Sequence, residues 1–154
     1  PKLLKKLLRS HPWNFAIRRV ALADTGNTPI YGFTNEFAIP SDVLRILDTN
    51  LLDDQSWVVE NNSSGDRVVL ANTAAMSIKY MKSITDTTVF PPDFEEALSF
   101  LIAADIAYSL TNSRSLARDM FTLYKAEVAE ARSFDGQESS LAEVEANEWT
   151  DVRF

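Results

Sequence analysis

His11 is the only histidine in the 154-residue chain, so it is the first candidate for acid–base catalysis or metal binding. A hydrolase triad would need this ring beside a serine and a carboxylate, and no serine stands in a Gly-x-Ser-x-Gly context. Pro12 follows directly, and proline keeps the residue before it out of the helical region. We therefore expect a structural role for His11 and no catalytic residue in the chain.

The other candidates for metal or cofactor chemistry are carboxylates. Glu95-Glu96 and the pair Glu127 and Glu130 lack partner histidines or a D-x-D loop, so they are typical of solvated helix faces. The chain has no cysteine, which excludes a thiolate metal site and a thiol nucleophile. It has only four glycines and no glycine-rich phosphate loop. The sequence therefore predicts no cofactor and no metal ion.

Asp105 stands within an otherwise apolar stretch. A carboxylate that is buried in such a stretch must find a partner or become neutral. We expect a structural or intersubunit salt bridge there, and the candidate partners are Arg18, Arg19, Arg45 and Arg114.

Charge is distributed unevenly along the chain. The formal net charge is −7, which argues against a surface that grips nucleic acid throughout. Residues 1–22 nevertheless carry only basic charges, at Lys2, Lys5, Lys6, Arg9, Arg18 and Arg19. Residues 135–154 are acidic, with Arg153 set against Asp135, Glu138, Glu143, Glu145, Glu148 and Asp151. No apolar run approaches the roughly 20 residues of a membrane span, so we expect no membrane contact.

Hydrophobic periodicity predicts the elements that must position these residues. The first half of the chain is expected to form a helix over 2–10, a strand over 14–23, an alternating strand over 31–39 and a short helix that Ser41 caps. Further strands are expected over 56–60, 67–72 and 77–82, with a hairpin turn at 61–66. Two long helices should follow, over 93–110 and 114–134, and Asp135-Gly136 should end the second. Ile102 and Ile106 make a second side of the first long helix apolar, which predicts a central position for it.

The expected fold is therefore α+β. A long antiparallel helical hairpin, about 92–135, should accompany a small, mostly antiparallel sheet region, about 14–84. Residues 1–136 should form a single domain, and residues 137–154 an extended acidic tail.

Three sequence blocks follow one another in a specific order: HPWNFA at residues 11–16, FAIPSDVLRIL at 37–47 and FPPDFEEAL at 90–98. In this order and spacing they resemble the tail tubular protein A family, the head-to-tail adaptors of short-tailed bacteriophages (podoviruses), over most of residues 7–150. The first block reads as a hinge between a helix and a strand. Its structural motif is His11, Pro12, Trp13, Asn14 and Phe15. The large ring of Trp13 follows a helix break by two residues, so we expect it to be buried in the core, against the sheet or the helical pair.

The resemblance implies a virion protein without enzymatic activity. Such an adaptor forms a homo-oligomeric ring, dodecameric like the portal, between the portal protein and the tail nozzle protein. Genomic DNA passes through its channel without sequence-specific binding. The chain would then be found in the tail or neck of the virion, and in the host cytoplasm during assembly.

The acidic tail ends in apolar side chains that cannot build a core of their own. The resemblance favours a docking role for it, because related adaptors engage the portal through their C-terminal segment. The predicted interface, with the portal or a neighbouring subunit, is Trp149, Val152, Arg153 and Phe154. The alternative is a tail that packs on its own domain or stays disordered.

Other functions remain open at this point. A head-completion or connector protein of a longer-tailed phage would share the helical ring logic. An enzymatic tail component is disfavoured, because no acid–base pair stands in a defined context. An acidic binding module unrelated to phage is a further alternative.

Overall fold

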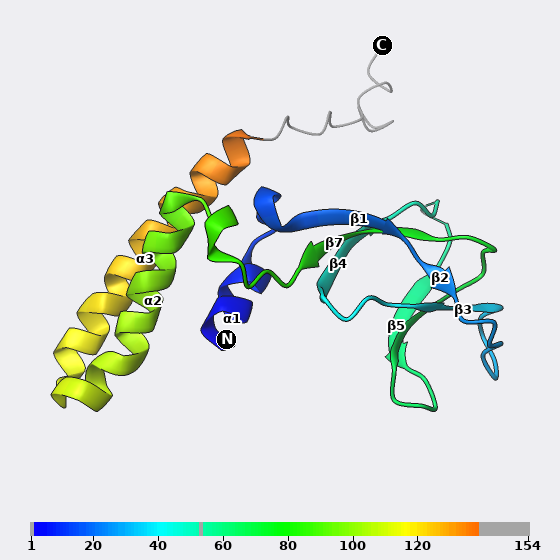
Figure 1. The fold of residues 1–154 in the computed structure, drawn as a ribbon, viewed down its shortest axis with the longest axis horizontal. Helices are drawn as coiled ribbons and strands as arrows, with labels where there is room; N and C mark the ends of the chain where they lie inside the picture. Colours follow the sequence, from blue (N-terminus) through cyan, green and yellow to red (C-terminus); the bar gives the residue numbers. More distant parts are fainter. Residues whose placement is uncertain (1, 53, 139–154) are drawn as a thin grey trace, which may run out of the picture.

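A computed structural model describes residues 2–52 and 54–138. The protein is α+β, with three helices and two antiparallel sheets in the described part (Figure 1). The helices are α1 (Lys2–Ser10), α2 (Pro92–Thr111) and α3 (Arg114–Gln137). The strands are β1 (Ile17–Ala21), β2 (Ala23–Asp24), β3 (Asn35–Ala38), β4 (Val43–Thr49), β5 (Trp57–Asn61), β6 (Arg67–Ala71) and β7 (Ser77–Lys82). Short 3-10 turns lie at Asn14–Ala16 and Thr87–Val89.

The two sheets lie beyond α1 from the long helices, so that the helices form one end of the molecule and the sheets the other (Figure 1). One sheet has the strand order β1-β7-β4, and the other has the order β2-β3-β6-β5. All their pairings are antiparallel. The sequence predicted one small sheet, and the structure has two.

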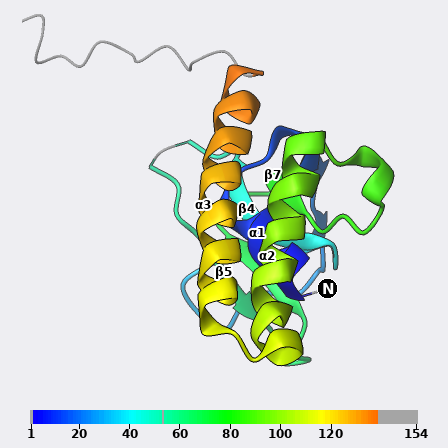
Figure 2. The same cartoon turned by 90° about the vertical axis from the view of Figure 1, so that its left-hand side faces the viewer.

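Helices α2 and α3 lie side by side and are joined by two residues (Figure 2). Asn112 takes the left-handed conformation that ends α2, with φ of 53°. The hydroxyl of Ser113 then caps α3 by accepting a hydrogen bond from the Leu116 N–H at 3.3 Å. At its far end α3 continues to Gln137, so the prediction that Asp135-Gly136 ends this helix is wrong. Gly136 is accommodated within the last turn.

The short helix predicted after Ser41 is also wrong, because this segment forms β4. Its apolar residues have helical spacing, but β4 pairs with β7 in a register that shifts between Val43 and Arg45 and again between Ile46 and Asp48. Each irregularity places an extra residue in the strand and interrupts the alternation of inward and outward side chains. Pairing in the sheet therefore overrides a pattern that is typical of a helix.

Two predicted strands are shorter than expected. The segment over 14–23 begins with a 3-10 turn before β1 and is interrupted at Leu22 before β2. The segment over 31–39 is extended only in β3, while residues 25–34 form a loop. The strands over 56–60, 67–72 and 77–82 are confirmed within one residue at each end, as is the hairpin turn between β5 and β6.

The buried side chains form two separate cores. The first, which we call the helical core, lies where α1 and the HPWNFA block meet α2 and α3, and it includes Leu7, Trp13, Phe94 and Ala131. The second, which we call the sheet core, lies between the two sheets. Its members are Leu22, Phe37, Val43, Val69, Ala71, Met76, Ile78 and Tyr80.

Candidate interaction surfaces

The HPWNFA block is a structural junction. Trp13 is 1% exposed, and its ring packs edge-on against Phe94 at 5.0 Å and against His11 at 4.8 Å between centroids. Its Nε1–H donates to the Leu7 carbonyl oxygen at 3.1 Å, which satisfies the one polar atom of the ring. The expectation that Trp13 belongs to the core is confirmed.

Asp135 joins this junction to the end of α3. One carboxylate oxygen lies 3.0 Å from Nε2 of His11, and the other accepts the Asn14 backbone N–H at 2.8 Å. The Asn14 side-chain amide also donates to the Asp135 carbonyl oxygen at 2.6 Å. These three contacts, which we call the Asp135 clamp, give His11 and Asn14 of the block a structural role. Sequence reasoning placed Asp135 in a helix end and missed its role as the partner of the lone histidine.

Within the described residues of one copy Asp105 forms no salt bridge, and an intersubunit salt bridge stays a prediction. Its side chain is exposed on α2, and among the described residues the ion pairs are His11–Asp135 and Lys82–Asp42. The four arginines proposed as its partners therefore do not meet it within one copy. Burial was inferred from the apolar neighbours along the sequence, but those neighbours are partly exposed as well.

The described part of the chain contains no group of histidine and carboxylate side chains that is suitable for a metal ion. The carboxyl of Glu127 instead lies near those of Glu96, Glu130 and Asp93, which act on it as like charges. Partial burial and these like charges raise the pKa of the Glu127 carboxyl above its ordinary value. The arrangement is a region of negative potential on α2 and α3.

The loop between β2 and β3 is held by a second buried carboxylate. Glu36 accepts hydrogen bonds from Thr25 Oγ1 at 3.0 Å and from the amides of Asn27 and Asn62 at 3.2 Å each. Burial and the nearby Asp24 raise the pKa of this carboxyl, but the hydrogen bonds outweigh them and hold it below its ordinary value. The loop presents Ile30 to solvent completely.

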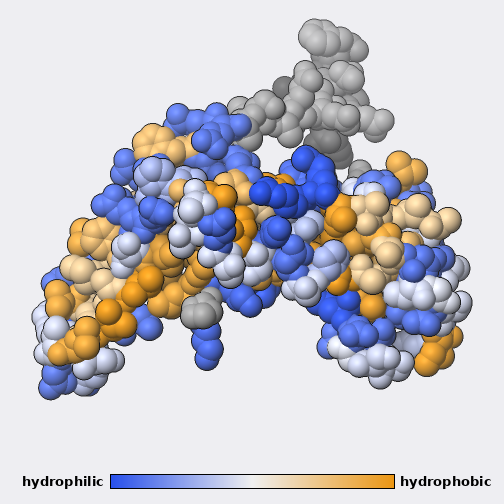
Figure 3. Space-filling view, viewed as in Figure 1, coloured by the Kyte–Doolittle hydropathy of each residue, from blue (hydrophilic) through white to orange (hydrophobic). Residues whose placement is uncertain are grey.

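The long helices leave large apolar side chains uncovered. Ile102 and Ile106 are 42% and 44% exposed, so the predicted central position of α2 is wrong for a single copy. Figure 3 shows apolar residues along the side of the helical pair that borders the hollow of the molecule. Over all their sides together, the large apolar residues that α2 and α3 expose are Ile102, Ile106, Tyr108, Leu110, Leu116, Phe121, Leu123 and Phe134. Apolar surface of this extent typically marks an interaction site.

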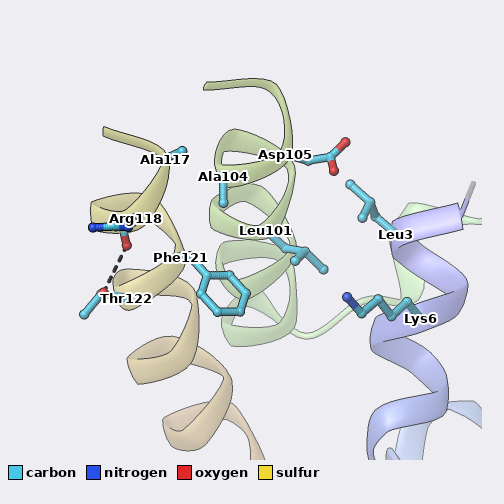
Figure 4. A pocket seen from close by; sticks show the side chains of 9 residues that line it. All are labelled: Leu3, Lys6, Leu101, Ala104, Asp105, Ala117, Arg118, Phe121 and Thr122. Atoms are coloured by element: carbon cyan, nitrogen blue, oxygen red, sulfur yellow. Dashed lines mark hydrogen bonds between the residues drawn. The ribbon is translucent and has the colours of Figure 1, made fainter. Parts of the chain in front are cut away.

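A groove of about 530 Å³ lies between α1 and the helical pair, and we call it the α1 groove. Figure 4 shows Leu3 and Lys6 extending from α1 toward α2, and Phe121 lying between α3 and Leu101 of α2. The apolar lining is Leu3, Leu101, Ala104, Ala117 and Phe121, and the polar lining is Lys6, Asp105, Arg118 and Thr122. The groove therefore combines an apolar lining with two basic side chains and one acidic side chain.

No protein-family model matches the chain, and no curated protein matches it either. No helix in the described residues is long and apolar enough to cross a membrane. The predicted interface residues Trp149, Val152, Arg153 and Phe154 lie outside the described residues. In the described residues, the features that bear on function are therefore the exposed apolar side chains of α2 and α3, the α1 groove and the junction at the HPWNFA block.

Proposed function

We propose that the chain is a structural virion protein, the head-to-tail adaptor that joins the portal to the tail nozzle and continues the DNA channel. Copies of it would assemble as a ring on the portal, and the free subunit would enter this ring in the host cytoplasm. The helical hairpin would form the scaffold of the ring, and the sheets would face the nozzle or bridge subunits. The ring would pass DNA during ejection without reading its sequence.

The observation that carries this proposal is the open apolar side of α2 and α3. Leu110 is 76% exposed at the end of α2 and Ile106 is 44% exposed one turn before it. A single copy leaves these side chains in water. Burying them between copies would stabilise the assembly by about 0.8 kcal/mol for each CH₂ group. Repeated helical contacts between copies would remove this surface from water.

The charge distribution supports heterologous contacts between copies. Helix α1 exposes Lys2, Lys5, Lys6 and Arg9, whereas α2 and α3 expose acidic residues near Glu127. A surface that meets a different surface of the next copy generates a closed ring when the rotation between copies closes. Exposed pairs contribute only about 0–1 kcal/mol each, so they would orient the contact while the apolar residues stabilise it.

The test is the mass of the chain in solution with and without the portal protein of the same phage. We expect a monomer or small oligomer alone and a ring of many copies on the portal, visible by electron microscopy of the purified complex. A single bound copy, or no binding, would refute the adaptor proposal. A ring that forms and binds a portal together with a long tail tube would instead favour the connector of a longer-tailed phage.

A further inference from the structure

The α1 groove has the chemistry to bind an acidic segment with apolar side chains. Its floor is apolar, and Phe121 in it is 42% exposed. Its rim carries the positive charges of Lys6 on α1 and Arg118 on α3, both exposed. Within the described part of the chain neither of these cations has a carboxylate partner within salt-bridge distance.

The basic character extends beyond the lining. Lys2, Lys5 and Arg9 are also exposed on α1, and this helix contains no acidic residue. Asp105 is the only acidic residue among those that line the groove, as far as the described residues show. An occupant that brings carboxylates together with large apolar groups would therefore complement both properties of the site.

The chain itself contains such a segment. Residues 139–154, which lie outside the described part, read SSLAEVEANEWTDVRF. The segment has four carboxylates, Glu143, Glu145, Glu148 and Asp151, against one arginine, and it intersperses Leu141, Val144, Trp149, Val152 and Phe154. Aromatic side chains of this kind are frequent anchors in protein interfaces.

We propose that the α1 groove of one copy binds residues 139–154 of a second copy. Each copy then donates its own segment and accepts that of a neighbour, which is a heterologous contact able to propagate around a ring. This inference rests on the proposed function, because it names the contact that links successive subunits of the adaptor.

The length of residues 139–154 allows a neighbouring copy to be the acceptor. The segment starts after Glu138, and Thr122 of the groove lies about 24 Å back along the helix at 1.5 Å per residue. Sixteen residues extend to at most about 53–58 Å, which is long enough to enter another molecule. The same length would also reach the groove of its own copy, and a ring requires the contact between neighbouring copies.

The chain has no cysteine, so introduced thiols report this contact without background. Full-length Thr150→Cys, carrying one affinity tag, is mixed with full-length Thr122→Cys carrying another, and a short thiol-specific cross-linker is added. The control replaces Thr122→Cys by Ser133→Cys, an equally small and exposed site on α3 that lies three turns nearer Glu138. We expect a heterodimer with Thr122→Cys at least about tenfold more abundant than with Ser133→Cys.

Equal yields at the two sites, or no cross-linking at either, would overturn the inference. A Thr122→Cys/Thr150→Cys double variant that joins only within one chain would overturn it too, because the segment would then occupy its own groove. The mass of the assembly on the portal is measured in parallel. A complete ring without the Thr122 cross-link rejects this contact and leaves the adaptor proposal standing, whereas absence of a ring rejects the adaptor proposal itself.

Charge reversal at the rim tests the chemistry of the same contact. Lys6→Glu should lower the yield of the Thr122–Thr150 cross-link several-fold, because the rim then repels the carboxylates of the segment. Lys5→Glu is the matched control, since it changes the same charge on the neighbouring residue of α1 outside the groove lining. Equal losses in the two variants would indicate attraction to the whole basic helix and would contradict binding in the groove.

Discussion

Two buried carboxylates organise the two ends of the molecule in different ways. Asp135 and Glu36 are the buried charged side chains of the described residues, and both carboxylates form hydrogen bonds. Asp135 connects residues more than 120 positions apart, from the HPWNFA block to the end of α3. Glu36 connects residues 9 to 26 positions away and fixes one loop. A buried carboxylate therefore joins distant segments of the chain at the helical end and fixes a single loop at the sheet end.

The two cores also differ in the kind of side chain that fills them. The helical core is rich in aromatic rings. Trp13, Phe15, Phe90 and Phe94 make edge-on contacts at 4.9 to 5.8 Å between centroids, and the Trp13–Phe15 pair is tilted at 6.3 Å. The sheet core is mainly aliphatic around Phe37 and Tyr80. Because aromatic rings bury the most area per residue, we expect substitutions in the helical core to be the more costly.

The largest expected effect is that of Trp13→Ala. The substitution removes a fully buried ring from the helical core, and we expect a loss of about 3–5 kcal/mol in the free energy of unfolding. Urea denaturation followed by far-ultraviolet circular dichroism measures this loss. Trp57→Ala in β5 is the matched control: Trp57 is 38% exposed, so about 1 kcal/mol or less is expected. Equal costs at the two sites would contradict the burial of Trp13 in the helical core.

The next effect concerns the clamp at Asp135. Asp135→Ala leaves the Asn14 N–H without its acceptor, and a loss of about 1–3 kcal/mol is expected. Asp119→Ala, an exposed carboxylate on the same helix, should change stability by no more than about 0.5 kcal/mol. A double-mutant cycle with His11→Ala should give a coupling of about 0.5–3 kcal/mol. Additive effects in this cycle would show that the His11–Asp135 contact contributes nothing.

Much of this architecture was predictable from local signals. Both long helices start within one residue of the predicted positions, since α2 begins at Pro92 and α3 at Arg114. The hairpin between β5 and β6 follows from its turn residues, with Gly65 at φ of 86°. Trp13 was predicted to lie in the core because a large apolar ring that follows a helix break by two residues is expected to be buried.

The errors come from information that is not local. Whether the residues after Ser41 form a helix or a strand depends on their pairing with β7, whose partner residues lie 29 to 39 positions away. The burial expected for Asp105 depended on neighbours along α2 that a single copy leaves exposed. The partner of His11 was missed because Asp135 is adjacent only in the fold. In each case the deciding contact joins residues that sequence patterns treat separately.

A smaller effect, with a pH dependence, is expected at Glu36. Its pKa is lowered in the folded protein relative to about 4.3 in an unfolded chain. Its charge therefore stabilises the fold above about pH 4.3, and this contribution is lost as the pH falls through the folded pKa. Glu36→Gln should cost about 1 kcal/mol at pH 7, and the difference from the wild type should shrink below pH 4. Urea midpoints across pH 3–7 test this; Glu60→Gln, an exposed acid on β5, should show no comparable trend.

The smallest effect on stability is expected at the open side of α2, where the effect on assembly should be large. Ile106→Ser replaces a half-exposed side chain, so the free energy of unfolding should fall by at most about 1 kcal/mol. If this side chain packs against a neighbouring copy, the same substitution should weaken ring formation on the portal at least several-fold, measured by the mass distribution of the complex. Ile30→Ser is the control, because Ile30 is more exposed and belongs to the loop between β2 and β3, strands that lie at the opposite end of the molecule from the helical pair (Figure 1). Ring formation lost in Ile30→Ser and kept in Ile106→Ser would assign assembly to the sheets and reverse the roles proposed for the two ends.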